Sequence, residues 1–265
     1  MRLIGIIMIY ILIFWFFIYV RCLVTKNNQE QIKEEFMTNL ISPMEKAQIY
    51  SLLEILSNCF KISNTTYWII SGTTLGSVRH GEMIPWDDDA DVAIFQDDLG
   101  KVLNFNKVLN TFGYEIVPHW LIYKFRKIGQ EYPFVDIFCY YKSGDKYIMN
   151  YEELRNKWPE EYYTPSELFP LKNYKFGSLS LPGPNYPLPY LDRTYPGWQY
   201  VGIMGYDHKN QEKIHEEVDL NQNDESHKLV PYKIFNMKNK KINHHTFMKK
   251  KYDKYHNKKI LLFEE

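Results

Sequence analysis

The sequence predicts an α+β protein in which helices pack against a sheet, with one membrane-spanning helix ahead of this domain. Residues 44–60 carry apolar side chains at the spacing of a helix with one buried face. Residues 67–70, 92–95 and 134–140 are short apolar runs, which are typical of buried strands. Residues 3–20 form an almost unbroken apolar run that is about long enough to cross a bilayer.

The apolar run at the N-terminus fits an uncleaved signal anchor better than a cleaved signal peptide. No cleavage site made of small residues follows it, because the flanking sequence is Tyr19-Val20-Arg21-Cys22-Leu23. We therefore expect residues 1–24 to be a signal-anchor transmembrane segment and residues 25–42 to be a stem. Basic residues lie on both sides of the run, so the positive-inside rule leaves the orientation open.

A helix and two strands are expected after the strand at residues 92–95. Asp97 or Asp98 can cap the helix, and Gly113 can close it. Residues 114–117 and 121–128 then have the pattern of strands, and side chains of different character alternate along the second.

Beyond residue 140 the sequence becomes rich in loops. Residues 151–158 predict a short helix. Residues 167–198 are dense in proline, glycine and tyrosine, which favours loops and short strands over a helical bundle. Residues 207–265 contain few apolar side chains and many Lys, Asn and His, and they predict a polar tail. The alternative for this segment is a basic flap that contacts an anionic acceptor or a membrane surface.

An acidic run leads directly into the apolar strand at residues 92–95. It contains Asp87, Asp88, Asp89 and Asp91. In an extended chain side chains alternate, so Asp87, Asp89 and Asp91 would share one face. Carboxylates this close repel each other and are costly to remove from water unless a cation neutralises them. Such oxygen ligands suit Mg²⁺ or Mn²⁺, which proteins commonly hold together with substrate phosphates. The run therefore predicts one or two of these ions and phosphate chemistry.

A phosphate-binding turn is expected just before the acidic run. The strand at residues 67–70 ends at Gly72 and Thr73, and a glycine lets backbone N–H groups approach an anion closely. Arg79 follows, where a guanidinium could bind a diphosphate or neutralise an aspartate. An ordinary surface salt bridge is the alternative for Arg79. We therefore expect Gly72, Thr73 and Arg79 to contact the phosphates of a bound ligand.

The order of these features resembles the DNA polymerase β-like nucleotidyltransferase fold, with a strand, a Gly-Thr turn, a helix and a strand that opens with Asp-x-Asp. Within that fold, residues 71–81 (SGTTLGSVRHG) and 84–92 (IPWDDDADV) resemble the LicD and fukutin-related family of phospho-alcohol transferases. The resemblance covers about residues 44–198. It implies a mixed sheet flanked by helices, with the catalytic domain at residues 43–206.

The resemblance also implies roles for individual residues. Enzymes with this fold carry a third carboxylate on a later strand, and Asp136 in the sequence Asp-Ile-Phe matches that position. Asp89, Asp91 and Asp136 would then be catalytic, and together with Asp87 they would hold the metal. Without that context, a lone aspartate in a strand is more commonly an edge residue or the partner of an arginine.

The reaction implied by the resemblance is a metal-dependent transfer of a phospho-alcohol, such as phosphocholine or ribitol phosphate. The donor would be a CDP-linked alcohol, the acceptor a glycan or glycolipid hydroxyl, and the second product CMP. The resemblance further implies a single-pass membrane protein of the Golgi or ER with a lumenal catalytic domain.

Other functions for the acidic run fit less well. An EF-hand loop would need glycine in place of Val92 and glutamate in place of Asp98. In sugar-nucleotide glycosyltransferases the Asp-x-Asp pair ends an apolar strand, whereas here Asp89 and Asp91 precede one. Transfer of a nucleotide to an acceptor stays open. So does a non-catalytic binding or scaffold protein that keeps the fold. A solvated acidic turn without a ligand is a separate alternative for the run itself.

The composition excludes some classes of protein. The formal net charge of zero argues against a dedicated nucleic-acid binder, which normally has a basic excess. Cys22, Cys59 and Cys139 are too widely spaced to form a zinc site. The sequence does not decide whether Cys59 and Cys139 form a disulfide.

Overall fold

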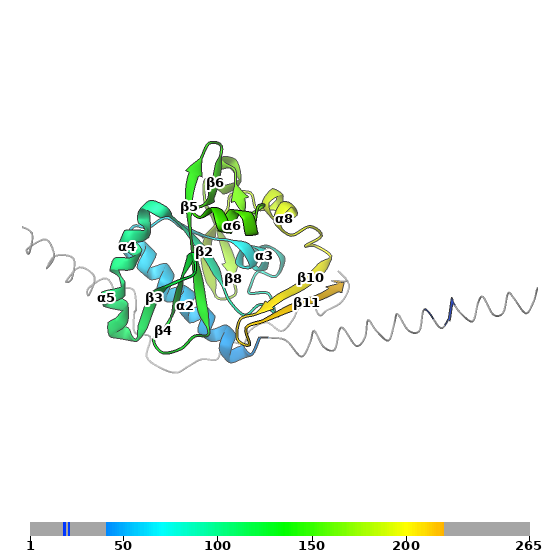
Figure 1. Ribbon diagram of the computed structural model, residues 1–265, viewed down its shortest axis with the longest axis horizontal. Helices are drawn as coiled ribbons and strands as arrows, with labels where there is room; N and C mark the ends of the chain where they lie inside the picture. Colours follow the sequence, from blue (N-terminus) through cyan, green and yellow to red (C-terminus); the bar gives the residue numbers. More distant parts are fainter. Residues whose placement is uncertain (1–17, 20, 22–40, 220–265) are drawn as a thin grey trace, which may run out of the picture.

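The computed structural model describes residues 41–219 together with residues 18, 19 and 21 (Figure 1). Most of the predicted signal anchor and stem, and residues 220–265 of the predicted tail, lie outside the described residues. Among the residues that are described, no helix has both the length and the hydrophobicity of a membrane span.

A mixed sheet of seven strands forms the centre of the domain. Its strands are β1 (Tyr67–Ile69), β2 (Asp91–Phe95), β3 (Tyr114–His119), β4 (Ile122–Lys127), β5 (Phe134–Ser143), β6 (Lys146–Met149) and β7 (Tyr162–Tyr163). The order is β1-β2-β5-β4-β3, while β6 pairs with β5 and β7 pairs with β6. Strands β2 and β5 are parallel and every other pair is antiparallel. Since strands and helices mix in this way, the predicted α+β class with a mixed sheet is confirmed.

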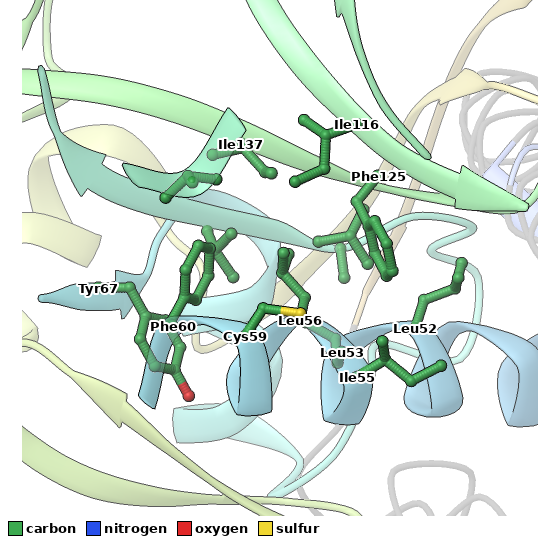
Figure 2. Packing of buried hydrophobic residues seen from close by; sticks show 14 of the residues in the cluster. Leu52, Leu53, Ile55, Leu56, Cys59, Phe60, Tyr67, Ile116, Phe125 and Ile137 are labelled. Atoms are coloured by element: carbon green, nitrogen blue, oxygen red, sulfur yellow. The ribbon is translucent and has the colours of Figure 1, made fainter. Parts of the chain in front are cut away.

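Helix α2 (Pro43–Ile62) covers one face of the sheet (Figures 1 and 2). It starts with a capping box, in which the side chains of Ser42 and Glu45 each bond to the backbone of the other residue, and Pro43 occupies its first turn. Its apolar side chains pack against the sheet as the helical spacing predicts. Figure 2 labels Leu52, Leu53, Ile55, Leu56, Cys59 and Phe60 from the helix beside Tyr67, Ile116, Phe125 and Ile137 from the strands.

The two cysteines in the described part of the chain, Cys59 and Cys139, are free and buried in this core. Burial raises the pKa of each thiol to about 12, so neither is a reactive thiolate at neutral pH.

The helix predicted between residues 97 and 113 is divided into short pieces. They are η1 (Gln96–Asp98), α4 (Leu99–Asn104), α5 (Asn106–Leu109) and η2 (Asn110–Phe112). The division places Asn106 against β3, where its side-chain amide donates to the Ile116 carbonyl and accepts from the Ile116 N–H, both at 2.6 Å. Asp98 precedes α4 but makes no capping hydrogen bond, because its carboxylate pairs with Lys101 instead. Gly113 ends the segment in a left-handed conformation, as predicted.

The opposite face of the sheet is covered by short elements that surround a second hydrophobic core. These elements are α3 (Ser71–Arg79), α6 (Glu152–Lys157), α7 (Pro165–Leu168), α8 (Leu188–Thr194), and the hairpin of β10 (Val201–Asp207) with β11 (Glu212–Asp219). The hairpin of β8 (Lys172–Phe176) with β9 (Leu179–Gly183) contributes Phe176 and Leu181 to the core beneath α2 instead. The short helix predicted at residues 151–158 is α6. Residues 167–198 contain loops and the short strands β8 and β9, as the proline and glycine density predicts, together with the seven-residue helix α8.

The hairpin of β10 and β11 spans residues 206 and 207, where the sequence analysis placed the end of the catalytic domain and the start of the tail. Its two strands pair from Val201 with Asp219 to Asp207 with Glu212. Residues 207–219 therefore belong to a folded hairpin rather than to a polar tail. In Figure 1 the hairpin lies along the lower edge of the domain, beside the end at which β5 begins.

Candidate active site

Three carboxylates from a loop and two neighbouring strands come together at one end of the sheet. Asp91 opens β2, and in the parallel pairing its register partner on β5 is Asp136. The Asp136 N–H donates to the Ala90 carbonyl at 2.8 Å, which joins β5 to the acidic loop. The loop residue Asp89 is buried beside them. Potential ligand atoms of Asp89, Asp91 and Asp136 all lie within 4.8 Å of one another.

These acids share the face of the sheet that looks away from α2. Side chains alternate along a strand, and Val92 and Ile137, which follow Asp91 and Asp136, lie in the core beneath α2. The next residues along, Ala93 and Phe138, lie in the second core. The acids therefore point toward the side that carries α3 and the hairpin of β10 and β11.

The pKa values of the three acids reflect a shortage of positive charge. Burial, followed by the charges of Asp89 and Asp136, raises the pKa of Asp91 well above its ordinary value. Burial and the charge of Asp89 raise the pKa of Asp136 to about 7, although the nearby ammonium of Lys124 opposes this shift. Burial also raises the pKa of Asp89. Such values are expected where carboxylates crowd together without a cation.

The three carboxylates of Asp89, Asp91 and Asp136 are suitable ligands for a hard divalent cation. One oxygen of Asp136, Oδ1, is buried and has no hydrogen-bond partner, and the Lys124 ammonium lies 3.7 Å from it. A buried carboxylate oxygen normally has a partner. Three carboxylates that converge, with one oxygen unsatisfied, form the all-oxygen set that Mg²⁺ and Mn²⁺ prefer.

Gly72 lies directly against the acidic loop. A Cβ at this position would be 2.7 Å from Oδ2 of Asp87 and 3.9 Å from Oδ2 of Asp91. The missing side chain thus makes room for the Asp87 carboxylate. Among the described residues two groups of side chains could hold a metal ion, namely Asp89, Asp91 and Asp136, and Asp88, Asp89 and His208, and Asp87 belongs to neither. Burial and the charges of Asp89 and Asp88 raise its pKa well above the ordinary range.

Thr73 links the first turn of α3 to the start of β2. Its Oγ1 accepts a hydrogen bond of 2.7 Å from the Asp91 N–H, and the residue is buried. Its hydroxyl therefore holds an acidic residue in place. The phosphate contact expected for Thr73 would have to come from its backbone N–H.

The start of α3 is also fixed by two residues that the sequence did not single out. Ser71, at a φ of 46°, donates from its backbone N–H to the Tyr190 hydroxyl at 2.9 Å. The carboxylate of Glu161 accepts from the Tyr190 hydroxyl at 2.6 Å and from the Ser71 hydroxyl at 3.2 Å. Burial raises the pKa of Glu161 to about 7.

Arg79 is held by the backbone that leads into β10. Its Nη1 donates to the carbonyls of Trp198 at 2.8 Å and Val201 at 3.3 Å, and its guanidinium lies over the Trp86 ring. Burial lowers its pKa to about 10, against the opposing effect of Asp87. Arg79 is thus a half-buried cation near the acidic loop, held by backbone carbonyls, and its contact with phosphate stays a prediction.

His208 is a site residue that the sequence analysis missed. It lies in the turn between β10 and β11, and its Nδ1 lies 2.7 Å from Oδ1 of Asp88, while Nε2 lies 3.3 Å from Oδ2 of Asp89. The His208 N–H also donates to Asp88 at 2.8 Å. Burial lowers its pKa, but the hydrogen bond to Asp88 and the charge of Asp89 outweigh this effect and raise the pKa to about 9. No local pattern marks this histidine within a polar stretch.

A mixed sheet that presents carboxylates from β2 and β5 beside the first turn of a helix is the arrangement that the sequence analysis expected of a nucleotidyltransferase-like domain. Residues 64–186 match the family model described as the LicD/FKTN/FKRP nucleotidyltransferase domain. Over these residues the predicted resemblance to this family is confirmed.

Several known proteins are similar to parts of the chain. An uncharacterized protein of Rickettsia prowazekii is 34% identical over 177 residues, which are 67% of this chain and 63% of that protein. An uncharacterized protein of Rickettsia typhi is 36% identical over 167 residues, or 62% of this chain and 50% of that protein. The chain thus spans about half to under two thirds of the length of these relatives. The human ribitol 5-phosphate transferase FKRP is 49% identical over 35 residues, which are 13% of this chain and 7% of that protein.

Among solved structures, the lincosamide antibiotic adenylyltransferase LnuA, bound to lincomycin, is 19% identical with a TM-score of 0.38. The likeness covers 56% of this chain and 86% of that chain. It is too weak to support a conclusion about this chain.

Proposed function

We propose that this chain is a metal-dependent transferase that moves a phospho-alcohol from a CDP-linked donor to a hydroxyl of a glycan or glycolipid and releases CMP. The observation that carries the proposal is the convergence of Asp89, Asp91 and Asp136 within 4.8 Å, with an unsatisfied oxygen on Asp136. The family supports a transferase, and the short likeness to ribitol 5-phosphate transferases supports a phospho-alcohol as the transferred group.

In this proposal Asp89 and Asp91 hold the metal, with Asp136 beside them. The bound ion would neutralise the donor diphosphate and the charge that develops on the leaving CMP. Asp87 stays at the edge of the site, against Gly72.

The first turn of α3 binds the donor phosphates. The N–H groups at the start of a helix have no partners within that helix, and they attract anions. The N–H groups of Gly72 and Thr73 belong to this turn, and Gly72 lies beside the carboxylates of Asp87 and Asp91. Glu161 and Tyr190 fix the turn through Ser71, so that these N–H groups keep their direction.

Asp136 is placed to accept the proton of the attacking hydroxyl. The acceptor oxygen forms a bond to the phosphorus of the phospho-alcohol, the bond from this phosphorus to the bridging oxygen of the diphosphate breaks, and CMP leaves with that oxygen. The hydroxyl proton passes to the Asp136 carboxylate. Lys124, 3.7 Å away, holds this carboxylate in position.

A release assay tests the proposal. The protein is incubated with Mg²⁺ and a panel of CDP-linked alcohols that includes CDP-choline and CDP-ribitol, and CMP is measured. We expect CMP with at least one donor, loss of release with EDTA, and loss in folded Asp89→Ala and Asp91→Ala variants. Unchanged release in both variants would contradict the proposal. Inorganic diphosphate from a nucleoside triphosphate, without CMP from any donor, would indicate nucleotide transfer instead.

The proposal extends to the cellular location. The apolar run at residues 3–20 would anchor the protein in a Golgi or ER membrane, with the domain in the lumen. Protease protection of the domain in sealed microsomes is the expected result, and digestion without detergent would place it in the cytosol.

A further inference from the structure

Two exposed tryptophans and a lysine form a separate surface on the domain, which we call the indole shelf (Trp120, Lys157 and Trp158). The Trp120 side chain is 61% exposed and that of Trp158 is 37% exposed. The Lys157 ammonium lies 5.1 Å from the centroid of the Trp120 ring and 4.2 Å from that of Trp158. The lysine thus joins two indoles from elements far apart in the sequence, the turn between β3 and β4 and the end of α6.

Trp120 is an unusual residue for its backbone conformation. It occupies the turn between β3 and β4 with a φ of 52°. This left-handed region favours glycine and asparagine, and a bulky side chain there is an outlier. Because the ring is exposed, burial in the core does not compensate the strain. Strained residues cluster at ligand sites, so a tryptophan held in this way points to a ligand.

The shelf lies next to the carboxylates of the active site. Phe138 follows Asp136 by two positions on β5, so both side chains point to the same face, about 7 Å apart along the strand. The Phe138 ring packs edge-on against Trp158, with 6.2 Å between the ring centroids. Packed side chains therefore connect Asp136 through the buried Phe138 to the shelf.

The shelf and the phosphate-binding turn lie on opposite sides of the acids. The turn follows β1, the acids stand on β2 and β5, and Trp120 precedes β4, while the strand order is β1-β2-β5-β4. In an in-line displacement the attacking oxygen approaches the phosphorus opposite to the leaving group. If α3 binds the donor diphosphate, the Asp136 side is where the acceptor enters. The shelf is therefore on the acceptor side.

The chemistry of the shelf suits a sugar ring. An exposed indole offers a flat apolar face with an electron-rich π-system, and the C–H groups on one face of a pyranose can pack against it. The Lys157 ammonium has three donors that can reach ring hydroxyls or an acidic substituent. Binding pockets combine apolar surface with a few polar groups in this manner.

We propose that the indole shelf binds a pyranose ring of the glycan acceptor and so directs its hydroxyl toward Asp136. This inference rests on the proposed transferase function, because it assigns an acceptor subsite for that reaction. Trp120 and Trp158 are specificity-determining residues in this assignment, and Lys157 orients the sugar through its hydroxyls.

A binding experiment tests the shelf without requiring turnover. The full chain is labelled with 5-fluorotryptophan, and the ¹⁹F resonances of Trp120 and Trp158 are assigned with Trp120→Phe and Trp158→Phe variants. Titration with cellotriose, maltotriose and chitotriose should shift these two resonances and leave the other four tryptophans unchanged. Trp120→Ala should weaken sugar binding at least tenfold. Tyr186→Ala, which removes another exposed aromatic ring (53% exposed), should not.

Two outcomes overturn the inference. Shifts of Trp120 and Trp158 with CMP but with none of the sugars would make the shelf a nucleobase site. An absence of shifts at both residues with every sugar would contradict the acceptor subsite.

The Trp120→Gly variant separates loss of a contact from loss of the fold. Glycine tolerates the left-handed conformation, so this variant should lose sugar binding while keeping the thermal midpoint of the wild type.

Kinetics distinguish failure of the shelf from failure of the proposed reaction. With an active donor, Trp120→Ala should raise the acceptor KM at least tenfold, whereas Tyr186→Ala should leave it unchanged. An unchanged acceptor KM would contradict the shelf and leave the transferase proposal intact. Absence of CMP with every donor would contradict the transferase proposal, and the ¹⁹F titration would still decide whether the shelf binds sugars.

Discussion

Lys124 and Asp136 face each other across β4 and β5, and the Lys124 ammonium lies 3.7 Å from Oδ1 of Asp136. Each side chain is only 9% exposed. The lysine also stands over the Phe134 ring, 3.1 Å from its centroid. Burial lowers the pKa of Lys124, whereas the charges of Asp136, Asp89 and Asp91 oppose this shift. A buried cation is thus placed against the acidic cluster.

The first prediction concerns this pair. Lys124→Met should lower the free energy of unfolding of the metal-free protein by roughly 3 kcal/mol at pH 7, because a buried carboxylate loses its cation. Lys101→Met is the matched control, since Lys101 is 52% exposed in its pair with Asp98. It should change stability by less than about 0.5 kcal/mol. Urea unfolding in EDTA measures both, and equal effects would contradict a stabilising role for the buried pair.

The second prediction concerns removal of the metal. Asp91→Asn should stabilise the protein in EDTA, because burial and the charges of Asp89 and Asp136, which raise the pKa of Asp91, would no longer act on a carboxylate at this position. Addition of Mg²⁺ should raise the thermal midpoint of the wild type, since a ligand that binds the folded state stabilises it. The Asn variant should respond less. Asp145→Asn, at an exposed position, should behave like the wild type in both conditions. A wild type that does not respond to Mg²⁺ or Mn²⁺ would contradict the metal site.

The third prediction concerns Glu161 and pH. Its pKa is raised from 4.5 to about 7 in the folded state, so the folded protein holds a proton that the unfolded chain has lost. The resulting stabilisation is full below pH 4.5 and is lost as the pH rises through 7. Wild-type stability should fall relative to Glu161→Gln by up to roughly 3 kcal/mol over this interval. Glu153→Gln, at an exposed position on α6, is the control and should follow the wild type at every pH. Parallel curves for the wild type and Glu161→Gln would contradict the raised pKa.

The sequence predicted the parts of the site that are local or that follow from strand geometry. The acidic loop enters β2 as expected, and the later aspartate on β5 lies beside it because the two strands are parallel. Helix α2, which packs against the sheet, was predicted from the helical spacing of its apolar residues. A one-residue shift in either strand would have turned Asp91 or Asp136 toward α2, so the buried face fixes the position of both acids.

Other site residues could not be predicted because long-range contacts place them. His208 reaches Asp88 from 120 positions away through the turn of a hairpin whose sequence is polar. Glu161 and Tyr190 meet Ser71 only after α8 packs on the sheet. Arg79 was assigned to phosphate from its neighbourhood in sequence, yet the backbone carbonyls at Trp198 and Val201 hold its guanidinium. Local patterns carry no information about partners of this kind.

The last prediction concerns the glycine of the phosphate-binding turn. Gly72→Ala should reduce CMP release at least tenfold, because the new Cβ would lie 2.7 Å from Oδ2 of Asp87 and must displace this carboxylate from its place beside the other acids. A displacement of 1 Å in a catalytic site can cost about a hundredfold in rate.

Gly100→Ala is the matched control for this change. Gly100 lies in α4, and a Cβ at this position would have no neighbouring atom within 4 Å, so the same substitution should stabilise the helix by roughly 0.5–1 kcal/mol and leave activity unchanged. A folded Gly72→Ala variant with wild-type release would show that the turn tolerates a side chain. The close approach of α3 to Asp87 would then have no part in binding phosphate.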